Sequence, residues 1–259
     1  MNNSKARIID KLYLALIYLF FYLPISVLIF YSFNNSSYSL VWHGFTTNWY
    51  HNLFQDSNLW IAAAHSLLIG TLAATMATII GTLAAVSLYR YRFMGKNFLN
   101  GMVFILIVTP DIVMGISLLL LFSIANMPLG FWSLLLAHIT FCIPFVVVTV
   151  YSRISGMDKN IFEAAKDLGA RESTIFRKIT FPLLLPAIIS GILLSFTLSF
   201  DDVMISYFVS GPGFEILPLK IYSMARLGVK PELNALCSVT FTLTLFLVIL
   251  SQRFTRKSS

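Results

Sequence analysis

Long apolar stretches alternate with short polar ones along the whole chain of 259 residues. Several of these stretches exceed the roughly 18 apolar residues that a helix needs to cross a hydrocarbon layer of about 30 Å. The pattern predicts six membrane-spanning helices and no separate soluble domain, so that residues 1–259 form a single transmembrane domain. The predicted spans are residues 12–31, 60–89, 98–124, 131–151, 183–209 and 234–252.

Composition agrees with an all-α integral membrane protein. Hydrophobic residues make up 58% of the chain, charged residues only 11%, and the mean hydropathy is +0.81. These values exclude an ordinary soluble domain. Cys142 and Cys237 both fall within predicted spans, which indicates buried packing rather than a disulfide. His65 and His138 stand alone in apolar segments, so we expect core histidines and no metal site.

Basic residues are distributed unevenly between the predicted loops. Of the 18 Lys and Arg residues, fifteen lie before the first span, in the 90–97 and 152–182 loops, or after the last span. The loops on the other side hold only Lys220, Arg226 and Lys230. The positive-inside rule then predicts that both termini and the 152–182 loop are cytoplasmic. The formal net charge of +7 therefore reflects topology, not a nucleic-acid surface.

The second predicted span carries a stripe of small residues, spaced four apart. Such a stripe allows the backbone of another helix to approach closely, which is how helices associate in lipid. The neighbouring helix belongs either to this chain or to a second subunit. The residues of the stripe are Ala73, Ala77, Gly81 and Ala85, with Gly70 nearby.

The polar 152–182 loop has the spacing of two short helices. Asn160 and Glu163 stand at capping-box spacing, which predicts a helix that begins near Ile161. Its apolar face should contain Ile161, Ala165 and Leu168. Gly169 suits the left-handed turn that would end this helix.

A second short helix is expected from about Ser173 until Pro182 and Pro186 break it. Two short helices around a glycine also occur in DNA-binding helix-turn-helix domains. A loop of about thirty residues between two spans has no room for the third helix and core of such a domain. Nucleic acid is therefore not an expected partner.

The segment EAAKDLGARESTIFRKITFP, residues 163–182, resembles the EAA motif of bacterial ABC-importer permeases, EAA-x3-G-x9-I-x-L-P. It departs from the motif only at Phe181, where the pattern has Leu. In that family the loop forms a coupling helix that docks on a cytosolic ATPase, which implies that Glu163 meets the ATPase and Gly169 reverses the chain. The matching residues are Glu163, Ala164, Ala165, Gly169, Ile179 and Pro182.

Further segments resemble the PotC-type permeases of the spermidine/putrescine ABC importer family. They are LYRYRF at 88–93, TPDIVMGISLL at 109–119, HITFCIPFVVVTVYSR at 138–153, LSFTLSFDDVMISYFVSGP at 194–212 and EILPLKIYSM at 215–224. The resemblance implies the type I importer permease fold, with six transmembrane helices, in the bacterial inner membrane. The implied partners are a cytosolic ABC ATPase dimer, a second homologous permease and a periplasmic polyamine-binding protein.

The chain itself contains no phosphate-binding loop sequence. Energy must then come from another polypeptide, as the resemblance also implies. We expect no catalytic residue and no cofactor in this chain, with ATP and Mg bound by the partner ATPase.

Three acids, Asp111, Asp201 and Asp202, lie within predicted spans away from their ends, with no Lys or Arg at that depth. Ionisable groups at membrane depth usually face a cavity and mark a pathway. Pro110 loosens the helix beside Asp111. Counted along straight helices at about 1.5 Å per residue, all three acids reach the outer half of the bilayer. Such a group predicts a path for a polyvalent cation such as a polyamine.

Neighbouring residues of a helix point about 100° apart, so only one of Asp201 and Asp202 is expected to face this path. The other would cap a helix or make structural hydrogen bonds. The rings of Phe200 and Tyr207 are candidate contacts for an ammonium group.

Other functions stay open on these residues alone. A cation-coupled secondary transporter also needs buried acids, but usually shows inverted repeats, and none is visible here. A channel subunit uses rings of acids but has no use for an EAA loop. An ABC permease for a different cationic solute is the third alternative.

Overall fold

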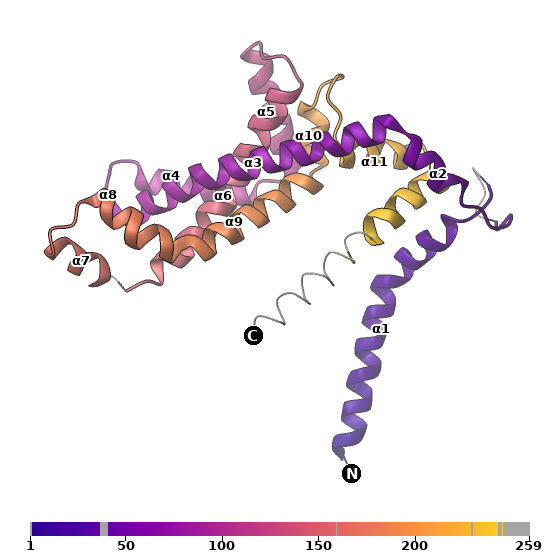
Figure 1. The fold of residues 1–259 in the computed structure, drawn as a ribbon, viewed down its shortest axis with the longest axis horizontal. Helices are drawn as coiled ribbons and strands as arrows, with labels where there is room; N and C mark the ends of the chain where they lie inside the picture. The colour runs from indigo at the N-terminus through magenta and orange to yellow at the C-terminus, as the bar shows by residue number, and fades with distance from the viewer. Residues whose placement is uncertain (1, 37–40, 159, 229, 243–244, 246–259) are drawn as a thin grey trace. The chain divides into compact units, whose positions relative to one another are not determined.

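The computed structural model describes residues 2–36, 41–158, 160–228, 230–242 and 245, and these residues are mostly helical (Figure 1). Within these ranges the β pairing is a single isolated bridge between Asn34 and Phe45. The predicted all-α class is therefore confirmed. The chain forms two compact units, Ile61–Lys220 and Met1–Trp60 with Ile221–Ser259.

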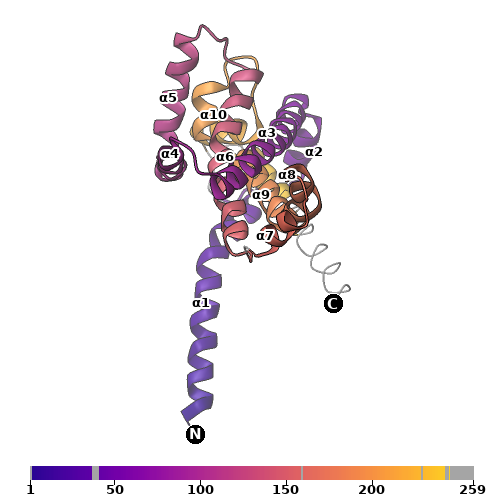
Figure 2. The same cartoon turned by 90° about the vertical axis from the view of Figure 1, so that its left-hand side faces the viewer.

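The larger unit is built on three long helices, α3 (Ser57–Arg90), α6 (Phe131–Ser155) and α9 (Phe181–Asp201), which run side by side in both views (Figures 1 and 2). The short helices α7 and α8 lie at one end of this bundle, away from α5 and α10. The shorter elements are α4 (Lys96–Val108), α5 (Asp111–Ile124), α7 (Asn160–Asp167), α8 (Glu172–Ile175), the π-helical turn η1 (Phe176–Thr180) and α10 (Met204–Val209). A further helix, α11 (Leu217–Arg226), contains the boundary between the two units.

The small-residue stripe of α3 packs against helices of the same chain. A Cβ added to Gly81 would lie 2.7 Å from Val146 Cβ on α6. A Cβ added to Gly70 would lie 3.2 Å from the ring of Phe196 on α9. The stripe's alanines, Ala73, Ala77 and Ala85, are fully buried. At these positions the helix that packs on the stripe therefore belongs to this chain and not to a second subunit.

The predicted span 98–124 is not one straight helix. It consists of α4 and α5, whose axes are bent by 115° at the break between them. Thr109 is extended (φ −64°, ψ 128°) because a residue before proline is disfavoured in the helical region. Pro110 is the N-cap of the next helix, α5, which begins at Asp111. The depth that a straight helix gives for Asp111 therefore does not hold.

The prediction that Pro182 and Pro186 break the helix is wrong. Residues Glu172–Asp201 form one continuous helical segment of 30 residues that contains both prolines. Just before Pro182, the turn η1 shifts the hydrogen-bond ladder, and the Phe181 N–H donates to the Phe176 carbonyl. A π-turn of this kind accommodates the N–H that proline lacks.

The predicted span 183–209 is also interrupted, but later, after Asp201. Asp202 is extended (φ −64°, ψ 130°), and α10 begins at Met204. The two acids therefore stand at a break between helices rather than inside one helix.

The smaller unit contains α1 (Asn2–Tyr31), α2 (Asn48–Gln55) and helical residues 231–242. Asn34 is buried and orders the segment between α1 and α2. Its Nδ2 donates to the Val41 carbonyl (2.9 Å) and its Oδ1 accepts the His43 N–H (2.8 Å). The Trp49 indole donates to the Asn34 carbonyl (2.8 Å). These bonds tie Asn34 to Val41, His43 and Trp49.

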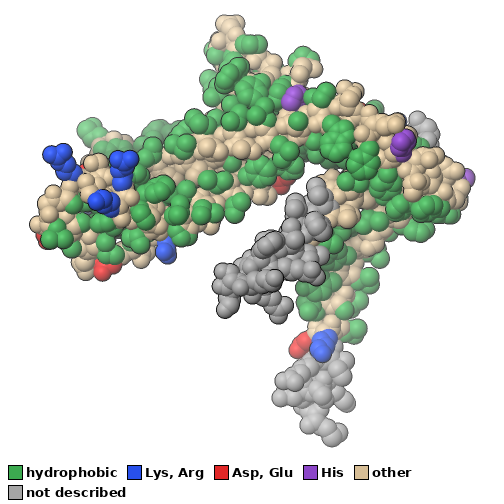
Figure 3. Space-filling view, viewed as in Figure 1, with side chains coloured by type: hydrophobic (Ala, Val, Ile, Leu, Met, Phe, Trp, Pro, Cys, Tyr) green, Lys and Arg blue, Asp and Glu red, His purple; other side chains and the backbone are tan. Residues whose placement is uncertain are grey.

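Four described helical segments are long and apolar enough to cross a membrane, and the bent α4–α5 pair is a fifth candidate. The predicted span 234–252 lies mostly outside the described residues, so six spans stay a prediction. On the face shown in Figure 3, hydrophobic side chains cover the length of the larger unit, and Lys and Arg gather at the end with α7 and α8.

Gly81→Ala should destabilise the protein because the new methyl group would overlap the Val146 side chain. Overpacking of this kind costs about 1–3 kcal/mol, which should lower the thermal midpoint in detergent by roughly 2–10 °C. Gly101→Ala is the matched control, since a Cβ there meets no atom within 4 Å. Equal midpoints for the two variants would contradict the close packing of α3 on α6.

Candidate functional site

The 152–182 loop folds around a small apolar core of its own. Phe162 and Ala165 on α7 are buried against Ile175 on α8. The predicted apolar face is therefore wrong in part, because Ala165 is buried whereas Leu168 is 87% exposed and Ile161 is 41% exposed. The buried face is rotated by one residue, so that the bulky Phe162 fills the core and two aliphatic side chains remain on the outside.

Both ends of α7 are fixed by local hydrogen bonds. At the start, the Asn160 N–H donates to Oδ1 of Asp158 (2.9 Å). The side chain that accepts a bond at this end is therefore that of Asp158, whereas the sequence predicted that of Asn160. At the end, Gly169 has φ +75° as expected. Its N–H donates to the Lys166 carbonyl (2.8 Å), and the Ala170 N–H donates to the Ala165 carbonyl (3.1 Å). This is the Schellman pattern, which requires a left-handed residue.

Arg90, the last residue of α3, joins this loop to the helical bundle. Its guanidinium lies 2.6 Å from Oε2 of Glu172, and the Arg90 side chain is only 9% exposed. The same group lies over the Phe162 ring, 5.6 Å from its centroid. Lys166 makes a second, more exposed ion pair with Glu172 at 3.3 Å. A charge-assisted bond on one side and an aromatic face on the other hold the loop against α3.

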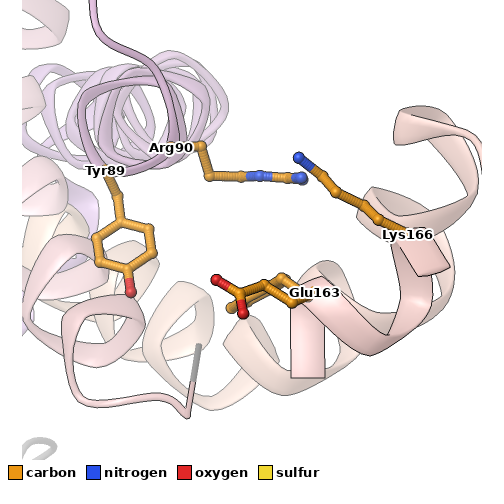
Figure 4. Close-up of a pocket in the computed structure, with 5 residues that line it drawn as sticks. Tyr89, Arg90, Glu163 and Lys166 are labelled. Carbon is orange, nitrogen blue, oxygen red and sulfur yellow. The ribbon is translucent and has the colours of Figure 1, made fainter. Parts of the chain in front are cut away.

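A pocket of about 250 Å³ opens beside Arg90 (Figure 4). In this view Arg90 and Lys166 point toward one another, and the Glu163 carboxylate points toward the Tyr89 ring. The first acid of the EAA segment thus faces a pocket shared with α3. The lining residues are Tyr89, Arg90, Phe162, Glu163 and Lys166.

The other residues of the EAA segment have different environments. Ala164 and Pro182 are exposed, and Ile179 packs partly buried against the core of the loop. Ala165 is buried, where its small side chain allows α7 to approach α8.

A second site lies far from this loop, where α5, α9 and α10 meet. A cavity of about 360 Å³ there is bordered by all three acids predicted to share a path. We call it the acidic cavity. Its lining residues are Asp111, Phe141, Leu198, Asp201, Asp202, Val203 and Met204.

Each acid occupies an end of a helix. Asp111 is the first residue of α5, and Asp201 is the last residue of α9. Both are exposed, whereas Asp202 is 8% exposed. Asp202 accepts the N–H groups of Ile205 (3.2 Å) and Ser206 (2.8 Å) and so caps α10. The prediction that one of the adjacent pair has a structural role agrees with this geometry. The reason given for it, that neighbouring residues of one helix point about 100° apart, does not hold, because α9 ends at Asp201 and Asp202 is extended.

Phe200 and Tyr207 lie outside the cavity lining. The Phe200 ring stacks on Phe196 with 5.6 Å between centroids, and Tyr207 on α10 is 50% exposed. The aromatic side chain that borders the cavity is Phe141.

The histidines and cysteines take structural positions. His65 Nδ1 lies 2.9 Å from the Glu215 carbonyl, and its ring stacks on Phe214. His138 is fully buried between Ser199 and Ser206. Cys142 and Cys237 are both free thiols, as predicted.

Two groups of residues in these sites were not predicted. The Arg90–Glu172 pair joins positions 82 residues apart, and no sequence spacing reveals such a pair. The polar contacts of His138 do have a signal, because Ser199, Asp202 and Ser206 recur at helical spacing within an apolar segment.

Comparison with known proteins gives the family. Residues 77–257 match the family described as binding-protein-dependent transport system inner membrane component. The chain is 56% identical to the spermidine/putrescine transport system permease protein PotC of Escherichia coli K12 over 250 residues, 96% of this chain and 95% of that protein. It is 55% identical to PotC of Haemophilus influenzae over 95% of this chain and 96% of that protein. The putrescine transport system permease protein PotI of E. coli K12 is 46% identical over 87% of this chain and 83% of its own length.

Solved structures agree on the fold. A bacterial ABC transporter involved in the import of the acidic polysaccharide alginate superposes with a TM-score of 0.75 at 17% identity, over 99% of this chain and 98% of that chain. The MetNI methionine ABC transporter gives a TM-score of 0.63 at 17% identity, over 79% of this chain and 99% of that chain. The chain therefore belongs to the inner membrane components of binding-protein-dependent transport systems and is a permease subunit with the type I ABC importer fold.

Proposed function

We propose that this permease carries polyamines, spermidine and putrescine, through the acidic cavity. The observation that carries the proposal is the convergence of Asp111, Asp201 and Asp202 on one cavity inside an apolar bundle. Carboxylates at membrane depth without a basic partner attract a cation of high charge. The names of the similar permeases from E. coli and H. influenzae support the same cargo.

The C-terminal end of α9 at the cavity favours a cation further. Asp201 closes α9, where the last carbonyl groups have no helical N–H partner. The C-terminal end of a helix carries partial negative charge, which adds to that of the carboxylate. Discontinuous helices of transporters coordinate cations with such ends. Asp111 contributes a second exposed carboxylate from the start of α5.

The 152–182 loop is proposed as the coupling element that meets a cytosolic ABC ATPase dimer. The exposed Leu168 and Ile161 give α7 an apolar outer face suited to docking. Arg90 would then carry the motion of the loop into α3 through Glu172. On this proposal the chain catalyses no reaction, holds no cofactor, and leaves ATP and Mg to the ATPase.

Further partners follow from the same proposal. A second homologous permease would complete the membrane unit, and a periplasmic polyamine-binding protein would deliver the cargo. Both termini and the 152–182 loop are proposed to be cytoplasmic. Membership in a binding-protein-dependent family disfavours the secondary transporter and the channel that the buried acids alone left open.

Arg90→Gln and Glu172→Gln should each lower substrate-stimulated ATP hydrolysis in the reconstituted complex by a few fold, because each removes the same ion pair. The double variant should be no worse than either single variant, since residues in direct contact are not additive. Lys166→Gln, whose side chain is 56% exposed, is the control and should change little. If the fold-losses of ATP hydrolysis in the two single variants multiply in the double variant, Arg90 and Glu172 act separately and the ion pair is not the coupling contact.

The orientation is tested by single cysteines in a chain whose Cys142 and Cys237 have been replaced. Gly213→Cys should react with an impermeant maleimide in intact cells, whereas Ser173→Cys should react only after permeabilisation. Both positions are exposed in the structure, so accessibility within the fold does not limit the reaction. Labelling of Ser173→Cys from outside would reverse the proposed topology.

Asp111→Asn and Asp201→Asn keep the shape of each side chain while removing its charge. Loss of a carboxylate that meets the cargo should cost on the order of 1–3 kcal/mol, or about five- to a hundred-fold in uptake at unchanged permease abundance. Spermidine uptake should fall at least as far as putrescine uptake, since spermidine has the higher charge. Uptake near wild type in both variants, in Asp202→Asn and in the triple variant would remove the acidic cavity as the path.

A further inference from the structure

A buried polar cluster connects α6 to both sides of the break between α9 and α10. Nδ1 of His138 on α6 lies 2.6 Å from the Ser199 hydroxyl on α9, and Nε2 lies 2.9 Å from the Ser206 hydroxyl on α10. The Ser206 hydroxyl also lies 2.7 Å from Oδ2 of Asp202, within the break itself. His138, Ser199 and Ser206 are all at most 2% exposed.

The donors and acceptors in this cluster have one consistent direction. An ionised carboxylate only accepts, so Ser206 donates its proton to Asp202. The Ser206 oxygen then accepts from Nε2–H of His138. A neutral imidazole has one donor and one acceptor, so Nδ1 accepts the proton of Ser199. This assignment of hydrogens satisfies every group with the imidazole neutral, and each hydroxyl proton in the chain points toward Asp202.

Such a cluster has a structural purpose at this place. Buried polar groups are costly unless all are satisfied, and a fully satisfied network fixes one arrangement of its members. Here it fixes the two helix ends and the carboxylate between them. Asp202 Oδ2 thereby receives the Ser206 N–H and hydroxyl, while His138 Nε2 stands 3.6 Å away. Asp201, its direct neighbour in the chain, is left facing the cavity.

We propose that His138 is a positioning residue of the transport path, which holds Asp202 and the α9–α10 break in place through Ser206. The proposal rests on the assignment of the acidic cavity as the cargo path. It gives His138 no contact with the cargo, since His138 is not among the residues that line the cavity.

The first test compares substitutions of His138. His138→Leu removes both hydrogen bonds of the imidazole and should lower spermidine uptake at least about ten-fold, because one lost hydrogen bond in a network that ends on a charged group already has an effect of about that size. His138→Gln keeps a donor near the position of Nε2 and should retain most of the uptake. Thr140→Ala, two residues further along α6, should behave as wild type, because Thr140 is exposed and its hydroxyl donates to the Leu136 carbonyl of the same helix. Uptake is normalised to permease abundance.

The second test is a double-mutant cycle with Asp202→Asn. If His138 acts through Asp202, His138→Leu should cause no further loss in the Asp202→Asn background. Combined with the distant Arg90→Gln, the same substitution should multiply the losses. Ser206→Ala is the smaller change and should repeat both results, which keeps the test valid if His138→Leu reduces assembly.

The outcomes separate the two proposals. Wild-type uptake in His138→Leu and Ser206→Ala, or losses that multiply with Asp202→Asn, would overturn the role of His138 and leave the acidic cavity intact. Wild-type uptake in Asp111→Asn, Asp201→Asn, Asp202→Asn and the triple variant would overturn the cavity itself, and the role of His138 in transport with it.

Discussion

Inside a lipid bilayer each backbone N–H and C=O group must find its partner within the protein, because no water is present to replace it. Most of this chain satisfies the rule with uninterrupted helix. Among the described residues, two breaks fall within predicted spans, at Thr109–Pro110 and at Asp202–Val203. Asp111, directly after the first break, and Asp201 and Asp202, at the second, all border the acidic cavity, so the carboxylates lie where the backbone departs from helix.

The two adjacent aspartates show how a break separates functions. The carboxylate oxygens of Asp202 accept hydrogen bonds from the first turn of α10 and from the Ser206 hydroxyl, and the side chain is buried. Asp201 remains exposed at the end of α9. A carboxylate whose lone pairs are filled by the protein has less to offer a cation than one that is still open. In this pair, the Asp202 carboxylate is held by hydrogen bonds within the protein, whereas the Asp201 carboxylate remains exposed.

Features that depend on local spacing were predictable from the sequence. Local spacing around Asn160 and Glu163 and the position of Gly169 predicted the short helix and its left-handed end, and the small residues of the second span indicated close packing. The proline positions were harder to interpret. Pro110 marks a sharp break, whereas Pro182 and Pro186 lie within continuous helix, because a preceding π-turn accommodates Pro182. Sequence shows the missing N–H but not the hydrogen-bond ladder around it.

Contacts between distant segments could not be predicted in the same way. Phe162 rather than Leu168 is buried on α7 because α3 and α8 supply the surface it packs on. Periodicity within eight residues of helix cannot choose between two faces that differ by one position.

The continuous segment Glu172–Asp201 has a mechanical consequence. It begins at Glu172, the partner of Arg90, ends at Asp201 in the cavity lining, and contains 30 residues. At about 1.5 Å per residue this is a rod of roughly 45 Å. If such a rod is pivoted at Glu172, a tilt of about 5° moves the far end by about 4 Å. That displacement is more than the length of a hydrogen bond, so a small rotation of the loop would be enough to make or break a polar contact at Asp201.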